Sequence, residues 1–142
     1  VALKGGNVEA GHRIFMEKIE ASCARCHKVK NEGAEVGPNL TNVASRGDRE
    51  YLLESIVNPN AKIAQGFETV MITLDDNSLH AGILKAETPT EVSLMPPGGA
   101  LETLPKARIK SREFGPSGMP PLASVLSKRE LRDVVEYLSS LK

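Results

Sequence analysis

The two cysteines of this 142-residue chain lie three positions apart, in the run Cys23-Ala24-Arg25-Cys26-His27. Because the two cysteines are so close in sequence, they cannot form a disulfide that spans the fold, and the role of the two thiols is local. Thiols at this spacing can reach the two vinyl groups of one porphyrin, and the histidine that follows is then directed at the iron. The run therefore predicts one haem c, attached through Cys23 and Cys26, with His27 as an iron ligand.

Three other interpretations compete with haem attachment. A structural zinc site needs four Cys or His ligands, but no second pair exists, and His12 and His80 are single and remote. A thioredoxin-like dithiol needs a strand before the motif and a helix after it, whereas here a helical pattern precedes the run and a Gly/Pro loop follows. The third interpretation is a chance match to a short string, which only the surrounding residues can decide.

A proline beyond the run favours haem. Pro38 follows Gly37 in a loop after His27, and it cannot donate a backbone hydrogen bond but presents a free carbonyl. That carbonyl can accept from Nδ1 of His27, which would fix the ring and strengthen it as a ligand. The alternative is an ordinary Gly-Pro turn.

A sixth iron ligand should come from a distant segment, because the opposite face of the haem must be closed by another part of the chain. Met119 is favoured, because it lies in an apolar loop that prolines hold rigid, and thioether ligation is a standard way to raise a haem potential. His80 is the main rival. The other methionines, for which core filling or exposure is expected, fall in helix or strand patterns: Met16, Met71 and Met95.

Helical patterns lie near both ends and in the middle of the chain. Asn7 can cap a helix over about residues 8–19, Asp48 one that stops before residues 58–59, and Ser127 starts a C-terminal helix with a capping box. Gly11 costs the first helix about 1 kcal/mol relative to Ala, which indicates close approach of another backbone. Residues 22–41 are expected to be irregular.

The period changes to two between the second and third helices. Alternating apolar residues predict a hairpin over residues 70–84, followed by further strands and a second turn at residues 96–99. We therefore expect a small antiparallel sheet at about residues 67–110, inserted into a helical protein.

Composition excludes some classes of partner. Lys and Arg number 18 and Asp and Glu number 18, so no net charge attracts the chain to nucleic acid or an acidic membrane. No apolar run has transmembrane length. With no Trp and 4% aromatics, the core is sparse in large flat groups, which a haem would supply. A local basic run at residues 106–112 is a candidate for steering an acidic partner, although a solvated strand face is the commoner explanation.

With these motifs the chain resembles class I c-type cytochromes. The residues that carry the resemblance are the Cys23–His27 run, Gly37-Pro38-Asn39-Leu40, Met119-Pro120, Gly11 with Phe15, and Tyr137-Leu138. More narrowly, Asn39-Leu40, Arg46, residues 50–56, Asn58-Pro59 and Gly66-Phe67 resemble the haem-binding domains of planctomycete and verrucomicrobial cytochromes. The family implies first and last helices that cross at the glycine around one haem.

These considerations give the expected fold. We expect a mainly α, class I cytochrome c fold that forms a single domain over residues 1–142, with the β insertion at about residues 67–110. Phe15, Leu40, Arg46 and Tyr51 are expected in the haem environment, with Arg46 or Tyr51 as a candidate propionate partner.

The expected function is outer-sphere transfer of one electron through a haem ligated by His27 and Met119. The protein would be a carrier and not an enzyme, with a relay domain of a larger exported dehydrogenase as one setting. Donor dehydrogenases and acceptor cytochromes or oxidases are the expected partners, with no nucleic acid, and the family implies a periplasmic or otherwise exported location. The alternative is a haem enzyme or gas-binding protein with an open or His-ligated sixth position.

Overall fold

The computed structural model describes residues 3–96 and 99–142, and the chain forms two compact units. The helical unit consists of residues 1–62 and 119–142, and the sheet unit of residues 63–118. The helical unit contains α1 (Val8–Glu17), α2 (Cys23–Cys26), β1 (Lys28–Val29), β2 (Glu32–Gly33), the 3₁₀ turn η1 (Val43–Ser45), α3 (Arg49–Val57) and α4 (Lys128–Ser139).

Local capping defines where the three longer helices begin. The side chain of Asn7 accepts from the amide of Ala10 at 2.8 Å, and that of Asp48 accepts from the amide of Tyr51. Ser127 opens α4 with a complete capping box. All three predicted helices are confirmed, although α1 ends at Glu17 and not near Ile19.

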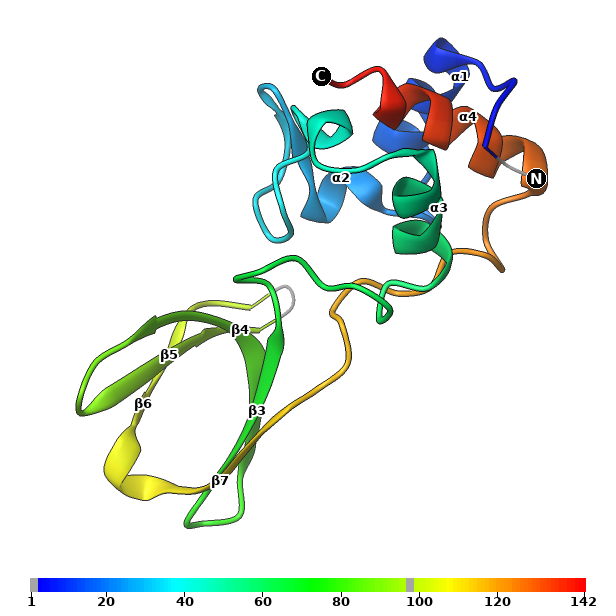
Figure 1. Ribbon diagram of the computed structural model, residues 1–142. Coiled ribbons are helices and arrows are strands. Elements are labelled where there is room, and N and C mark those ends of the chain that lie inside the picture. The colour runs from blue at the N-terminus through cyan, green and yellow to red at the C-terminus, as the bar shows by residue number, and fades with distance from the viewer. Residues whose placement is uncertain (1–2, 97–98) are drawn as a thin grey trace. The chain divides into compact units, whose positions relative to one another are not determined.

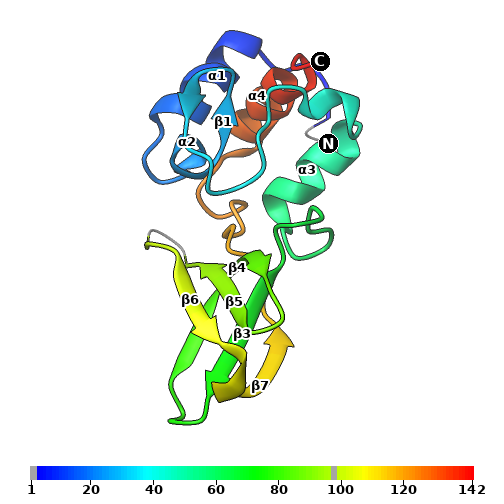
Figure 2. The ribbon, with the colours of Figure 1, turned by 90° about the vertical axis from the view of Figure 1, so that its left-hand side faces the viewer.

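Helices α1 and α4 lie side by side in both views of the molecule (Figures 1 and 2). A Cβ added at Gly11 would lie 2.0 Å from the carbonyl oxygen of Asp133, so only glycine permits this approach. Beside the crossing, the rings of Phe15 and Tyr137 pack with centroids 5.7 Å apart. Close approach of another backbone therefore explains the costly glycine inside α1.

The sheet unit is a five-stranded antiparallel sheet in the order β6-β5-β4-β3-β7, strongly curved in Figure 1. Paired residues share a face, so the alternating pattern places Val70, Ile72 and Leu74 of β3 in a core with Val92 and Leu94 of β5. The strands are β3 (Thr69–Leu74), β4 (Leu79–Glu87), β5 (Glu91–Met95), β6 (Glu102–Pro105) and β7 (Ile109–Phe114), with the 3₁₀ turn η2 (Lys106–Arg108) between the last two.

Two polar clusters join strands of this sheet that are not neighbours. His80 of β4 lies 2.8 Å from Glu102 of β6. Glu87, at the end of β4, accepts from Arg112 of β7 at 3.0 Å and pairs with Lys106 of η2 at 2.8 Å. The register shift between Leu84 and Ala86 shows that β4 is irregular just before Glu87.

The prediction of a mainly α fold is wrong. The structure is 30% helical and 25% strand over its described residues, with a five-stranded sheet that has its own buried core. The sheet was underestimated because β7 is almost wholly exposed and shows no apolar alternation, so its extent to Phe114 has no sequence signal. A single domain over residues 1–142 stays a prediction.

The stretch expected to be irregular contains the helical turn α2 and the short β1–β2 hairpin, both too brief to show a period. The predicted turn at residues 96–99 includes residues 97 and 98, which lie outside the described residues.

Candidate functional site

The cysteines mark the two ends of one helical turn. Cys23 is the first residue of α2 and Cys26 the last, and residues three apart on a helix share a face. Both thiols are free and half-buried. Burial raises the pKa of Cys23 to about 11, so this thiol is protonated at neutral pH. The turn thus presents two thiols toward one side.

His27 is the C-cap residue that follows α2, and its ring is fixed by a hydrogen bond. Its backbone amide donates to the carbonyl of Cys23 at 2.9 Å, and Nδ1 lies 2.8 Å from the carbonyl oxygen of Pro38. Burial lowers the pKa of His27, and the positive charge of Arg46 lowers it further. The hydrogen bond to Pro38 opposes both effects but does not cancel them. Because a carbonyl only accepts, a neutral ring carries its proton on Nδ1 and leaves the lone pair on Nε2 for a metal.

The segment after His27 folds back over the helical turn. The amide of Ala34 donates to the carbonyl of Ala24 at 3.0 Å, and that of Gly37 to the carbonyl of Cys26 at 2.6 Å. These bonds bring Pro38 beside the ring. Because these bonds tie the segment to α2 at two points, the segment can hold the Pro38 carbonyl in place.

Met119 lies in the helical unit, half-buried and packed against its core. The segment that follows it is anchored to α3, because the amide of Leu122 donates to the carbonyl of Ile56 at 3.0 Å. Other partly buried apolar side chains border the same core: Ala24, Leu40, Tyr51, Leu53 and Val57. The unit therefore has an apolar border of half-buried groups in addition to its closed interior.

The residues expected around the haem differ in their surroundings. Phe15 is 2% exposed and belongs to the α1–α4 contact. Leu40 and Tyr51 are half-buried at the border of the core. Arg46 is exposed and donates to the carbonyl of Asn39 at 3.0 Å.

A glycine under Tyr51 escaped the sequence reasoning. A Cβ at Gly47 would lie 2.1 Å from Cδ2 of the Tyr51 ring, so the ring rests on the backbone there. The position of this glycine, just before the N-cap residue Asp48, was the available signal.

His80 is a poor rival for the sixth position. Its Nδ1 bonds Glu102 and its Nε2 lies 3.0 Å from the hydroxyl of Ser78, so both ring nitrogens are already engaged within the sheet unit. His12 packs beside the ring of Tyr137 at 5.2 Å between centroids.

The basic run near β7 is paired within the sheet unit. Besides the two cations that bond Glu87, Arg108 pairs with Asp75 at 3.0 Å, and Lys110 donates to Asn77. With each of its four cations engaged, the run is a solvated strand face and does not support the steering role.

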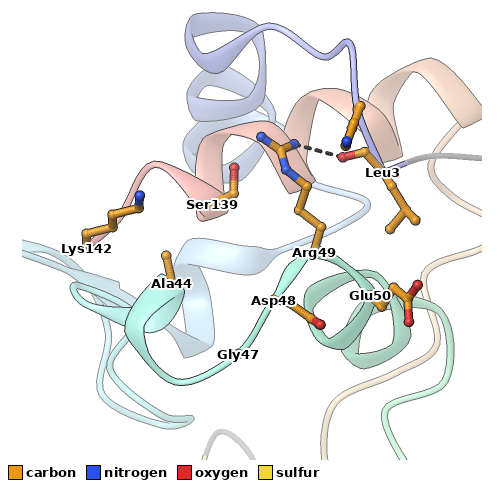
Figure 3. A pocket seen from close by; sticks show the side chains of 9 residues that line it. Leu3, Ala44, Gly47, Asp48, Arg49, Glu50, Ser139 and Lys142 are labelled. Atoms are coloured by element: carbon orange, nitrogen blue, oxygen red, sulfur yellow. Dashed lines mark hydrogen bonds between the residues drawn. The ribbon is translucent and has the colours of Figure 1, made fainter.

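A hollow beside the start of α3, seen in Figure 3, has no residue of the cysteine turn in its lining. It brings together charges of both signs, such as Asp48 and Lys142. Arg49 in its wall already donates to the carbonyl of Leu3 at 2.8 Å and to Glu136. Over residues 3–96 and 99–142, no group of three or more His, Cys, Asp or Glu side chains could hold a metal ion by itself.

The donor set around the cysteine turn fits haem c. Two thiols share one side of a turn, the next residue is an imidazole with Nδ1 engaged, and half-buried apolar side chains border the core. The family model for cytochrome c matches residues 8–87, more than half of the chain, and the chain belongs to the cytochrome c family. No curated protein matches the sequence.

Membership of this family defines the protein's general role. It is a haem-binding electron carrier, its haem c is bound covalently, and its partners are redox proteins. Domains of the family are typically exported or periplasmic. In the described part of the chain no helix is long and apolar enough to cross a membrane. The matched segment includes Cys23, Cys26, His27 and Pro38 but ends before Met119.

Proposed function

We propose that this protein carries a single haem c, attached through Cys23 and Cys26, and that His27 and Met119 are the two axial ligands. With both axial positions filled, no substrate reaches the iron, and the reaction is outer-sphere transfer of one electron. The observation that carries the proposal is the 2.8 Å contact between Nδ1 of His27 and the Pro38 carbonyl, directly after the cysteine turn.

Each residue has a defined task in this mechanism. A bound haem c supplies a one-electron couple between Fe(III) and Fe(II). The Pro38 carbonyl holds the His27 ring in one orientation and strengthens its basicity. The half-buried border, which includes Leu40, Tyr51 and Met119, would exclude water from a bound porphyrin. Because these contacts would hold His27 and Met119 in place in both oxidation states, little reorganisation would accompany transfer.

The finer assignments are also part of the proposal. We place Arg46 or Tyr51 near a propionate, because Arg46 is exposed and its charge already acts on His27. We propose export to the periplasm and service as a relay for a larger dehydrogenase. The likeness to the planctomycete and verrucomicrobial domains supports that setting and stays a prediction.

The first test asks whether haem is covalent. The full chain is expressed in a host with a cytochrome maturation system, denatured and washed with acid acetone. The wild-type polypeptide should keep its colour, and the double variant Cys23→Ala/Cys26→Ala should lose it. Colourless wild-type polypeptide would refute the proposed function.

The second test identifies the sixth ligand. The oxidised wild-type protein should show the weak red thioether-to-iron charge-transfer band, and Met119→Leu should lose it. Met71→Leu, a matched change in the sheet unit, should keep the band. CO should bind rapidly to ferrous Met119→Leu and not to the wild type. Rapid CO binding by the wild type at neutral pH would instead favour the open-site haem enzyme or gas sensor.

A further inference from the structure

Two glycines lie against His27, one at its main chain and one at its ring. Gly33, with φ +102°, would place an added Cβ 2.1 Å from the His27 carbonyl oxygen. Gly37 would place an added Cβ 2.8 Å from Cε1 and 3.1 Å from Nδ1 of the imidazole. The two positions therefore constrain different parts of the same residue.

The contact at Gly37 leaves little freedom on either side. Its amide donates to the carbonyl of Cys26 at 2.6 Å, which fixes the backbone from which the Cβ would project. The ring is held in turn by the Pro38 carbonyl, the next residue along the chain. Carbon atoms at optimal separation lie about 3.5–4.0 Å apart, so a methyl group at 2.8 Å from Cε1 must move something.

The imidazole is the part that would move. The imidazole can turn about its side-chain torsions, whereas the backbone of residue 37 is hydrogen-bonded to the carbonyl of Cys26 and is followed by a proline of fixed φ. The edge that the methyl group would strike runs from Nδ1 to Cε1. Turning that edge away lengthens the Nδ1 bond to Pro38 and redirects Nε2, the nitrogen left for the metal.

We propose that Gly37 is a positioning residue for His27, whose missing side chain lets the imidazole close onto the Pro38 carbonyl and aim Nε2 at the iron. This inference rests on the proposed function for its consequence on the haem, but its geometry concerns the polypeptide alone. The role of Gly33 is different, because its contact is with the main chain and its positive φ already favours glycine.

The test compares Gly37→Ala with the matched variant Gly33→Ala in the full chain. Gly37→Ala should raise the reduction potential, because a weaker bond to Pro38 makes His27 a poorer donor to Fe(III). It should also speed solvent exchange of the Nδ1 proton roughly fivefold, the factor expected from one hydrogen bond. Gly33→Ala should lower stability with a smaller change in both readouts. Equal changes in the two variants, or none in Gly37→Ala, would overturn the inference.

A measurement on the wild type decides the matter even if Gly37→Ala does not fold. The Gly37 α-protons should show a strong nuclear Overhauser effect to the Hε1 proton of His27 in the reduced, diamagnetic protein. Absence of that contact would overturn the role of Gly37, whereas the contact in a protein that lacks the thioether-to-iron band would count only against the proposed function.

Discussion

The contact between α1 and α4 at Gly11 gives a prediction whose size follows from the structure. In Gly11→Ala the new methyl carbon would lie 2.0 Å from the Asp133 carbonyl oxygen and 2.7 Å from Cβ of Tyr137. Ordinary contact is about 3.5 Å, so the two helices must separate by about 1.5 Å. That separation loosens the buried side chains beside the crossing, among them Phe15 and Val134.

Two opposing energies set the net effect of Gly11→Ala. Overpacking a well-packed contact costs about 1–3 kcal/mol, and loosening its neighbours places this site at the upper end. Alanine returns about 1 kcal/mol through its better helix propensity. We expect a net loss of about 2 kcal/mol in the free energy of unfolding, or roughly 5–8 °C in Tm.

Tyrosine fluorescence during urea unfolding is a suitable assay for Gly11→Ala. The chain has two tyrosines and no Trp, and Tyr51 and Tyr137 both lie in the helical unit. The signal therefore reports the unit that contains the mutation. Arg13→Ala, at an exposed position of the same helix, is the control and should leave the free energy of unfolding nearly unchanged. If Gly11→Ala were as stable as the wild type, Gly11 would be an ordinary surface glycine and the close helix contact would be wrong.

Two carboxylates that pair with cations, Glu87 and Glu136, supply further predictions. Hydrogen bonds from Arg112 and Lys106 lower the pKa of Glu87 from 4.5 to about 2. The ionised carboxylate therefore contributes fully to the free energy of unfolding above pH 4.5, and this contribution is lost as the pH falls towards 2. Glu87→Gln should remove that part of the acid dependence and speed amide hydrogen exchange in β7 at neutral pH; unchanged exchange would show that the cluster does not hold the strand. Arg49 lowers the pKa of Glu136 through bonds of 3.0 and 2.7 Å, and Glu136→Gln should cost about 1 kcal/mol by tyrosine fluorescence. The deficit should shrink in high salt, and a deficit independent of salt would contradict an electrostatic origin.

The three longer helices and the position of the candidate site could be predicted because their signals lie close together in the sequence. Asn7, Asp48 and Ser127 each act within three residues along the chain, so their caps could be predicted from spacing alone. The contact between Pro38 and His27 spans more of the sequence, and it could be predicted only as one of two interpretations, the other being an ordinary Gly-Pro turn.

Features that depend on distant pairing could not be predicted in the same way. The single turn α2 is too short to show a period, and the extent of β7 depends on pairing with β3, which lies far earlier in the chain. Neither the contact of Gly37 with the His27 ring nor the fourfold pairing of the basic run has a signature in spacing. Both features depend on tertiary contacts between segments that are separated in the sequence.

The interruption of the helical unit by residues 63–118 has a consequence for how the chain is made. The sheet unit is continuous, so it can become structured before the residues of α4 have emerged. The helical core is not, since Val134 and Tyr137 arrive last and complete the packing around Phe15. An early sheet would shorten the loop that α4 must close, because the entropy of closure grows with the length of flexible chain. Until α4 emerges, the cysteine turn stays beside an unfinished core, which keeps its thiols open to the machinery that attaches haem.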